Sequence, residues 1–109
     1  MTKVFIDLPN YSQQSNGVKC IYDLALYLFK NQISVVVLPR SISFFTCNQS
    51  NLNSNFGNIP FAFFPDGKKN DFLIACDTTP KKIIASARKL MIKIICWAQL
   101  MMEILEDLF

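Results

Sequence analysis

The 109-residue sequence contains no histidine. This absence excludes zinc sites of the Cys/His type, a His general base, and nucleophiles activated by a neighbouring His. The four cysteines, Cys20, Cys47, Cys76 and Cys96, are never paired at close spacing. We therefore expect no metal site and no bound cofactor, and we expect free thiols buried in the core of a protein from a reducing compartment.

Glycine is also scarce, with three residues in the whole chain. Neither the G-x-G-x-x-G fingerprint of dinucleotide-binding proteins nor the phosphate-binding P-loop motif is present. The first loop offers a single glycine in the step Asn16-Gly17-Val18. This step fits an ordinary helix start in which Asn16 is the N-cap, and it also fits a backbone that comes close to an anion. Both interpretations remain open from the sequence.

Charged residues make up 17% of the chain and hydrophobic residues 51%, against about a quarter charged in typical soluble domains. Either a tightly packed core or a missing partner surface explains this excess of apolar residues. The N-terminus lacks the pattern of a signal peptide. The longest apolar-rich stretch, Leu90 to Met102, is broken by Lys93 and Gln99 and is too short to span a membrane. We expect a single cytoplasmic domain over residues 1–109.

Apolar runs and helical periodicity alternate along the chain. Strands are predicted at Lys3 to Leu8, Ser34 to Leu38, Asp71 to Cys76 and Ile92 to Trp97, with a shorter one at Phe61 to Phe64. Helices are predicted at Gly17 to Lys30, closed by Asn31, at Pro80 to Leu90, and from about Met101 onward. An Asn/Ser-rich loop fills 40–60. The predicted fold is a Rossmann-like, doubly wound α/β domain with a mostly parallel sheet and helices on both faces.

Ligands of such sheets bind at the carboxyl ends of the strands, so the residues just after each strand are candidates for a site. Asp77, Thr78 and Thr79 follow one strand and fit contacts to sugar or ribose hydroxyls, or else the capping of a helix that begins at Pro80. Asp7 lies inside the first strand, where a phosphoacceptor would stand. The lysine that a receiver domain needs after a later strand is missing, which argues against that function.

Basic residues are concentrated in one predicted helix, and no acidic residue occurs between Lys81 and Met102. Lys81, Lys82, Arg88 and Lys89 all project away from its apolar stripe. This face is either simply solvated or directed at an anionic membrane, which would make the protein peripheral at the inner face of the membrane. Nucleic acid is not expected as a partner, because no aromatic residues interleave with these charges.

Three segments together resemble the N-terminal half of the GT-B glycosyltransferases, the group 1 or family 4-like enzymes. They are the opening strand, loop and helix with Ser15-Asn16-Gly17-Val18, the strand ending Cys76-Asp77-Thr78-Thr79, and the strand ending Trp97-Ala98-Gln99. The resemblance implies transfer of a sugar from a nucleotide-sugar donor to a glycan or lipid-linked acceptor. It implies that Asn16, Gly17 and Val18 approach the donor phosphates and that Asp77, Thr78 and Gln99 line the cleft.

The sequence also departs from that family. Asn16 stands where the first glycine of a Gly-Gly pair is usual, and no histidine follows Trp97. The second, donor-binding domain is absent, so the resemblance implies a truncated or split enzyme that is inactive without a second domain or chain. The alternative is a non-catalytic Rossmann-like module that binds a nucleotide or another protein.

Overall fold

The computed structural model describes residues 2–10, 16–41, 58–76 and 78–97 of the chain. Within these ranges the chain order is β1 (Lys3–Leu8), α1 (Asn16–Lys30), β2 (Ser34–Pro39), β3 (Phe72–Ala75), α3 (Lys81–Lys89) and β4 (Lys93–Cys96). The strands form one sheet in the order β2-β1-β3-β4, and every neighbouring pair is parallel. The predicted α/β fold with a parallel sheet is confirmed.

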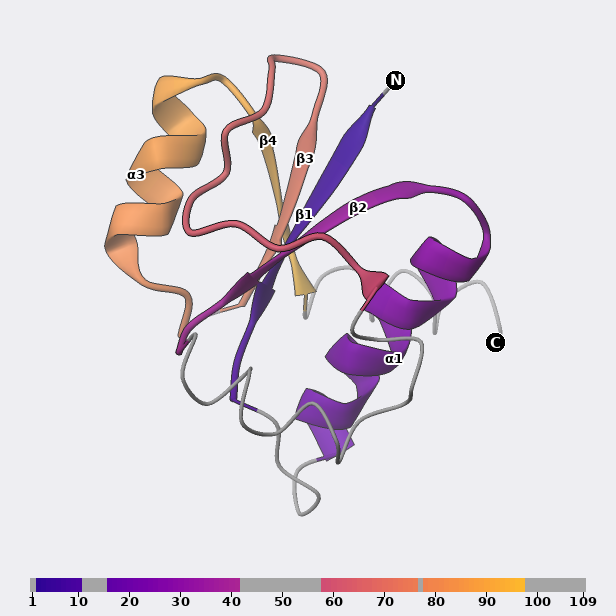
Figure 1. Ribbon diagram of the computed structural model, residues 1–109. Helices are drawn as coiled ribbons and strands as arrows, with labels where there is room; N and C mark the ends of the chain where they lie inside the picture. Colours follow the sequence, from indigo (N-terminus) through magenta and orange to yellow (C-terminus); the bar gives the residue numbers. More distant parts are fainter. Residues whose placement is uncertain (1, 11–15, 42–57, 77, 98–109) are drawn as a thin grey trace, which may run out of the picture.

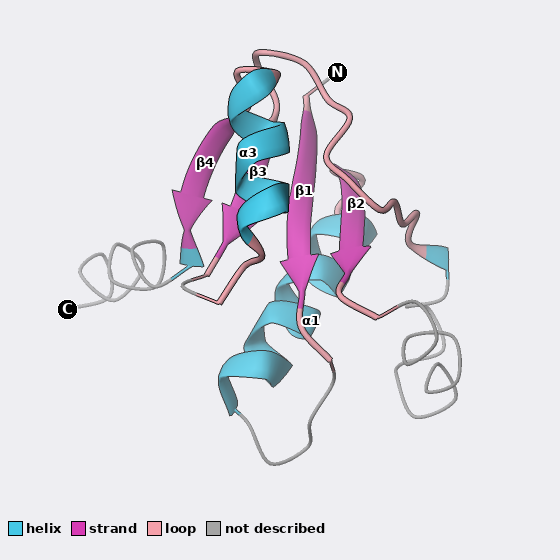
Figure 2. Cartoon of the chain, turned by 90° about the vertical axis from the view of Figure 1, so that its left-hand side faces the viewer, coloured by secondary structure: helices cyan, strands magenta, loops and turns pink. Residues whose placement is uncertain are grey.

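The two helices cover opposite faces of the sheet, which is viewed nearly edge-on between them in Figure 1 and from the α3 side in Figure 2. Side chains alternate between the faces along each strand. Ile6 and Leu8 of β1 pack in the core beneath α1, with Ile21 and Ala25 of that helix. Phe5, one position before Ile6, belongs instead to the core beneath α3. The next residue on the α3 side of β1 is Asp7, which is therefore a polar residue in a core position.

The core beneath each helix is made of fully or nearly fully buried aliphatic and aromatic groups. Burying one such side chain contributes roughly 1.5–3 kcal/mol to folding. The core beneath α1 contains Ile6, Leu8, Ile21, Tyr22, Ala25, Val35, Val37, Ile59 and Ile74. The core beneath α3 contains Phe5, Leu38, Leu73, Ala75, Ile83, Ala87 and Ile92. Two small cores on a shared sheet explain why the strands read as unbroken apolar runs.

The boundaries of these six elements agree with the predictions or differ from them by one residue, within the usual uncertainty of element ends. The strand predicted at Phe61 to Phe64 is wrong, because this segment makes only an isolated bridge between Phe61 and Val37. The segment lies beside the edge strand β2, but its pairing stops after this bridge. Pro60 and Pro65 flank it, and proline has no N–H to donate to a strand ladder. The predicted helix from Met101, and most of the loop at 40–60, lie outside the described residues.

Both helices end with a residue at positive φ followed by a strand. Gln32 after α1 has φ 63° and Met91 after α3 has φ 60°. At the first of these ends Asn31 closes the helix as predicted, since its side-chain amide donates to the carbonyl oxygen of Tyr27 at 2.8 Å. These turns return the chain to the sheet within a few residues and fix the amino ends of β2 and β4.

The strand order creates a topological switch point between β1 and β3. From β1 the chain crosses to β2 on one side, and it later enters β3 on the other side of β1. The loops that leave β1 and β3 therefore diverge to opposite faces of the sheet. In open α/β sheets the crevice at such a point, at the carboxyl ends of the strands, is where ligands bind. The fold therefore predicts a ligand site near Asp7 and the carboxyl end of β3.

Candidate functional site

An ion pair between Asp7 and Arg40 lies at the switch point. Asp7 stands near the carboxyl end of β1, and Arg40 follows β2 directly. The Arg40 Nη2 atom is 2.6 Å from the Asp7 Oδ2 atom, and Nε donates a longer bond of 3.5 Å to Oδ1. The Asp7 side chain is 1% exposed and that of Arg40 is 24% exposed. The bond to Asp7 raises the pKa of Arg40, although burial alone would lower it, so the guanidinium stays charged.

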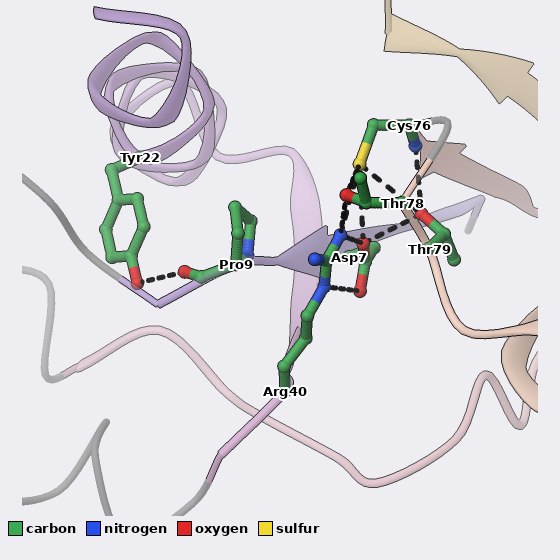
Figure 3. Close-up of polar contacts among 7 residues, drawn as sticks. All are labelled: Asp7, Pro9, Tyr22, Arg40, Cys76, Thr78 and Thr79. Carbon is green, nitrogen blue, oxygen red and sulfur yellow. Dashed lines mark hydrogen bonds and ion pairs between the residues drawn. The ribbon is translucent and has the colours of Figure 1, made fainter. Parts of the chain in front are cut away.

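Two threonine hydroxyls from the loop after β3 complete this arrangement (Figure 3). The Thr79 hydroxyl donates to Asp7 Oδ2 at 2.8 Å and accepts the backbone N–H of Cys76 at 2.9 Å. Thr78 accepts a bond of 2.8 Å from Arg40 Nη2. The capping interpretation of these hydroxyls is wrong, because the N-cap of α3 is Pro80 and has no side-chain hydrogen bond. The hydroxyls are used instead to hold the two charged groups.

Cys76 joins the same cluster through its sulfur. The Arg40 Nη2 atom lies 3.1 Å from Cys76 Sγ, and the Thr78 hydroxyl lies at the same distance. Burial raises the pKa of the Cys76 thiol, but contacts with Thr78 and Thr79 and the charge of Arg40 lower it more, so that the net shift is downward. The expectation of buried thiols is wrong for Cys20 and Cys96, which are exposed, and Cys76 is only partly buried. Cys47 lies outside the described residues.

A cavity of about 320 Å³ opens beside the ion pair. Its walls come from the ends of β1 and β2, from the start of α3 and from the segment before β3. The described residues that line it are Asp7, Leu38, Pro39, Arg40, Phe63, Phe64, Pro80, Lys82 and Ile83. This volume is at the lower end of the range of small-molecule sites. The cavity therefore has room for a sugar phosphate or for one portion of a larger ligand.

The cavity favours an anion electrostatically. Asp7 and Arg40 neutralise each other, which leaves the Lys82 ammonium as uncompensated charge. Lys82 also lies over the Phe64 ring, with its Nζ atom 5.9 Å from the ring centroid. The first turn of α3 contains no acidic residue, so the positive end of the helix dipole is not offset by a side chain. Phe63 and Phe64 are 68% and 46% exposed and add apolar ring faces to the rim.

The structure brings some of the predicted site residues to this region and leaves others elsewhere. Thr78 lies in the cluster, bonded to Arg40. Asn16 begins α1 itself, Gly17 is exposed, and Val18 packs against the core beneath that helix. Neither Gly17 nor Val18 is among the described residues that line the cavity. Asp77 and Gln99 lie outside the described residues. Thr78 is also not among the described residues that line the cavity, and the binding roles implied for all six residues stay predictions.

The basic residues of α3 are all exposed, as predicted: Lys81, Lys82, Arg88 and Lys89. At 100° per residue these four positions share one side of the helix, and the buried Ile83 and Ala87 lie on the other. Only Lys82 also contributes to the cavity. None of the helices in the described ranges has the length and hydropathy needed to cross a bilayer. A role of this face at an anionic membrane remains a prediction.

Arg40 and Cys76 were not predicted as site residues from the sequence, and Asp7 was predicted not to be a phosphoacceptor. A signal for Asp7 was present, because a single carboxylate in a strand of apolar residues needs a partner when it is buried. Arg40 directly after a strand that runs parallel to this one was the candidate cation within reach. Cys76 carried no signal, since its environment depends on loops that are distant in sequence. Among the described residues, no group of three or more Cys, Asp and Glu side chains is arranged to hold a metal ion.

No protein-family model, curated protein or solved structure matches the sequence or its fold. In its described residues the chain is a small α/β domain with a four-stranded parallel sheet and a polar cluster at the switch point.

Proposed function

We propose that this chain is one half of a two-domain glycosyltransferase and binds the phosphate-bearing part of a nucleotide sugar at the carboxyl edge of its sheet, while the second domain or chain supplies the rest of the donor site. The observation that carries the proposal is the cavity beside the switch point. It combines an uncompensated ammonium from Lys82, the unopposed positive end of α3, and ring faces of Phe63 and Phe64. Phosphate oxygens suit the first two features and a sugar or base ring suits the third.

Each group has a distinct part in the proposed complex. Lys82 and the backbone N–H groups of the first turn of α3 contact phosphate oxygens. The Thr78 hydroxyl and the Arg40 guanidinium offer hydrogen bonds to ligand hydroxyls or phosphates at the same edge. Asp7 does not bind the ligand directly but holds Arg40 in position, because its carboxylate is buried and paired. The cavity volume matches part of a nucleotide sugar, and the remainder of such a ligand would extend beyond this chain.

Sugar transfer itself requires a second domain or chain in this proposal. A site that lies between two domains is assembled only when both are present, so we expect no transfer by this chain alone. The exposed rings of Phe63 and Phe64 flank the cavity and would be covered by that partner. Apolar side chains at the rim of a site are common where a second domain closes over a ligand.

The binding test is a calorimetric titration of the purified chain with each of four compounds: UDP-glucose, UDP, glucose and inorganic phosphate. We expect the two nucleotides to bind and glucose to fail to bind. Lys82→Gln should weaken binding of UDP-glucose about tenfold, equivalent to about 1.4 kcal/mol. Lys89→Gln removes the same charge from the far end of α3 and should leave the affinity unchanged. Equal affinities of the two variants, or no nucleotide binding by the native chain, would exclude the proposed site.

The alternative is a non-catalytic protein-interaction module, which the exposed phenylalanines favour. Phe61, Phe63 and Phe64 are each at least 46% exposed within four residues of the chain. If they serve only a protein partner, the native chain binds none of the four titrants. The same calorimetry therefore separates the two functions.

The basic face of α3 supports a further part of the proposal, attachment to an anionic membrane that carries a lipid-linked acceptor. Each basic residue near an anionic surface contributes about 1 kcal/mol, so four give roughly 4 kcal/mol of reversible attachment. The native chain should sediment with vesicles containing anionic lipid at low salt, and not at 1 M salt, where the Debye length is about 3 Å. The variant with Lys81, Lys82, Arg88 and Lys89 all changed to Gln should stay in solution. Equal sedimentation of both proteins would show that the face is only solvated.

A further inference from the structure

The side chains around the cavity offer hydrogen-bond donors but no accessible acceptor. Six of the described lining residues have apolar side chains: Leu38, Pro39, Phe63, Phe64, Pro80 and Ile83. The polar ones are Asp7, Arg40 and Lys82, and guanidinium and ammonium groups only donate hydrogen bonds. Among these side chains Asp7 alone bears an acceptor, and it is 1% exposed and lies 2.6 Å from Arg40 Nη2. A ligand therefore meets donors and apolar surface in this cavity.

This lining suits phosphate groups and a flat ring better than it suits a hexose. Each hydroxyl of a hexose has a proton to donate, and a buried donor without an acceptor costs free energy. Phosphate oxygens accept hydrogen bonds, which matches Lys82 and Arg40. The described side-chain contacts of Arg40 all use its Nε and Nη2 atoms, which leaves Nη1 for a phosphate oxygen. The face of a nucleobase needs no hydrogen bond at all.

The two phenylalanines at the rim of the cavity have different surroundings. The Lys82 Nζ atom lies 5.9 Å from the centroid of the Phe64 ring, which is a distance at which a cation is attracted to a ring face. Phe63 is 68% exposed, compared with 46% for Phe64, and within the described part of the chain no cation lies over its ring. Phe64 therefore holds the ammonium beside the cavity, and Phe63 has a ring face that a ligand can use.

We propose that the ligand of this cavity is a nucleoside diphosphate, with its base stacked on Phe63 and its phosphates on Lys82 and Arg40, and that the donor sugar makes no contact with this chain. The inference rests on the proposed function and specifies which part of the nucleotide sugar is held here. Stacking on an aromatic side chain accepts any base, because every base has a π-face. Phe63 thus selects ligands that have a base without distinguishing uracil from adenine.

The experiment compares ligands that differ in one part at a time, by calorimetric titration of the full-length chain with UDP-glucose, UDP, ADP and pyrophosphate. We expect the Kd values of UDP-glucose, UDP and ADP to agree within about threefold. Pyrophosphate should bind about tenfold more weakly than UDP, because it has no base to stack. UDP-glucose bound more than tenfold more tightly than UDP would show that this chain contacts the sugar. That result would overturn the proposal, and so would pyrophosphate bound as tightly as UDP, or ADP bound more than tenfold more weakly than UDP.

Variants of the exposed rings test the part assigned to Phe63. Phe63→Leu keeps an apolar side chain but removes the ring, and it should weaken UDP binding about tenfold while leaving pyrophosphate binding unchanged. Phe63→Trp restores a ring and should bind UDP at least as well as the native chain. Phe61→Leu is the matched control, because Phe61 is 46% exposed and is not among the described residues that line the cavity. This control should leave the Kd of UDP unchanged.

The same titrations separate this inference from the function on which it rests. Lys82→Gln should weaken UDP and pyrophosphate by the same factor, because both ligands present phosphate oxygens to the ammonium. If Lys82→Gln weakens UDP and Phe63→Leu does not, the phosphate site stands and stacking on Phe63 is refuted. If the native chain binds neither UDP nor pyrophosphate, the proposed function and this inference both fail.

Discussion

Asp7 and Asp71 lie at opposite ends of β1 and are almost equally buried, with 3% and 4% of their surface exposed. Their partners differ in kind. Asp71 accepts the backbone N–H groups of Lys3 at 2.8 Å and Lys68 at 2.6 Å. Asp7 is held by side chains, the Arg40 guanidinium and the Thr79 hydroxyl. A carboxylate that accepts hydrogen bonds from backbone N–H groups fixes the path of the backbone. A carboxylate that is bonded to side chains positions groups that can also bind a ligand.

The two ends of the sheet therefore have different tasks. At the amino end, Asp71 ties the start of β1 to the turn that precedes β3, and its own backbone oxygen accepts the N–H of Lys93 at 3.1 Å. At the carboxyl end, the side chains that contact Asp7 follow two strands, β2 and β3, and Asp7 and Arg40 border a cavity. We expect changes at the amino end to reduce stability, and changes at the carboxyl end to alter ligand binding as well.

The largest effect is expected at Gly67, which lies against Asp71. A Cβ atom at this position would be 2.3 Å from Asp71 Oδ2 and 2.6 Å from Cε2 of Phe5. Phe5 is fully buried, so the ring cannot yield, and the carboxylate would be pushed from its N–H donors. Gly67→Ala should lower the free energy of unfolding by about 3–4 kcal/mol in urea titrations, combining overpacking with lost hydrogen bonds.

Gly17→Ala is the matched control for this change. Gly17 is exposed in the first turn of α1, where alanine is the better helix former by up to about 1 kcal/mol. The variant should be as stable as the native chain or slightly more so. If Gly67→Ala lowers the free energy of unfolding by less than about 1 kcal/mol, the amino end of the sheet adapts to the added methyl group and is not rigid.

The second effect concerns the two members of the ion pair. Arg40→Ala leaves the Asp7 carboxylate buried with the Thr79 hydroxyl as its principal donor, and should cost about 3 kcal/mol. Asp7→Ala leaves a guanidinium that is already 24% exposed and can turn to water, so it should cost about 1–2 kcal/mol. Urea titrations of both variants and of the double variant measure the coupling between them. Equal losses for the two single variants would contradict the view that Asp7 is the buried partner.

The third effect is a pH dependence at the amino end. Burial alone would raise the pKa of Asp71, but the N–H groups of Lys3 and Lys68 lower it more, so its folded-state pKa lies below the ordinary value. A depressed carboxyl pKa contributes stability that is full above the unfolded pKa of about 3.9, and that is lost as the pH falls through the folded pKa. The native chain should lose this contribution between about pH 4 and the folded pKa.

Asp71→Asn isolates that contribution. At pH 7 the variant should be less stable by about 2 kcal/mol, since a neutral amide oxygen replaces the charged acceptor. The difference from the native chain should shrink as the pH falls below 4. Asp66→Asn removes a negative charge from an exposed position in the same turn and serves as the charge control. A constant stability difference between native chain and Asp71→Asn from pH 7 to pH 2 would show that the carboxylate charge is not what matters.

Much of this fold could be predicted from sequence because its signals are local. Unbroken apolar runs such as Val35 to Leu38 mark strands covered on both faces, and the spacing of Ile83 and Ala87 marks the inward side of a helix. The parallel pairing followed from the alternation of such strands with helices. The segment from Phe61 to Phe64 was predicted as a strand because its aromatic residues have high β propensity, but its pairing with the edge strand β2 stops after one bridge to Val37.

The site was less predictable because its contacts join residues that are far apart in the chain. Arg40 is 33 positions from Asp7, and Thr79 is 72 positions away from it. Thr79 was taken as a possible helix cap, since hydroxyls before a proline usually serve that purpose. The structure shows that a buried carboxylate in the neighbouring strand competes for the same hydroxyl, and bonding a buried charge outweighs capping an exposed helix end.

The smallest effect, and the sharpest test of the carboxyl end, is a comparison of the adjacent threonines. Thr79→Val removes both the donor to Asp7 and the acceptor for the Cys76 N–H, at a position that is 9% exposed. It should therefore cost about 1–2 kcal/mol in urea. Thr78→Val removes an exposed hydroxyl whose partner, Arg40, can bond to water instead, and should cost less than about 0.5 kcal/mol. If buried Thr79 stabilises the fold and exposed Thr78 serves the ligand, Thr78→Val weakens ligand binding without altering stability. A Thr78→Val variant as unstable as Thr79→Val would show that both threonines are structural, and the carboxyl end of β1 would then resemble the amino end.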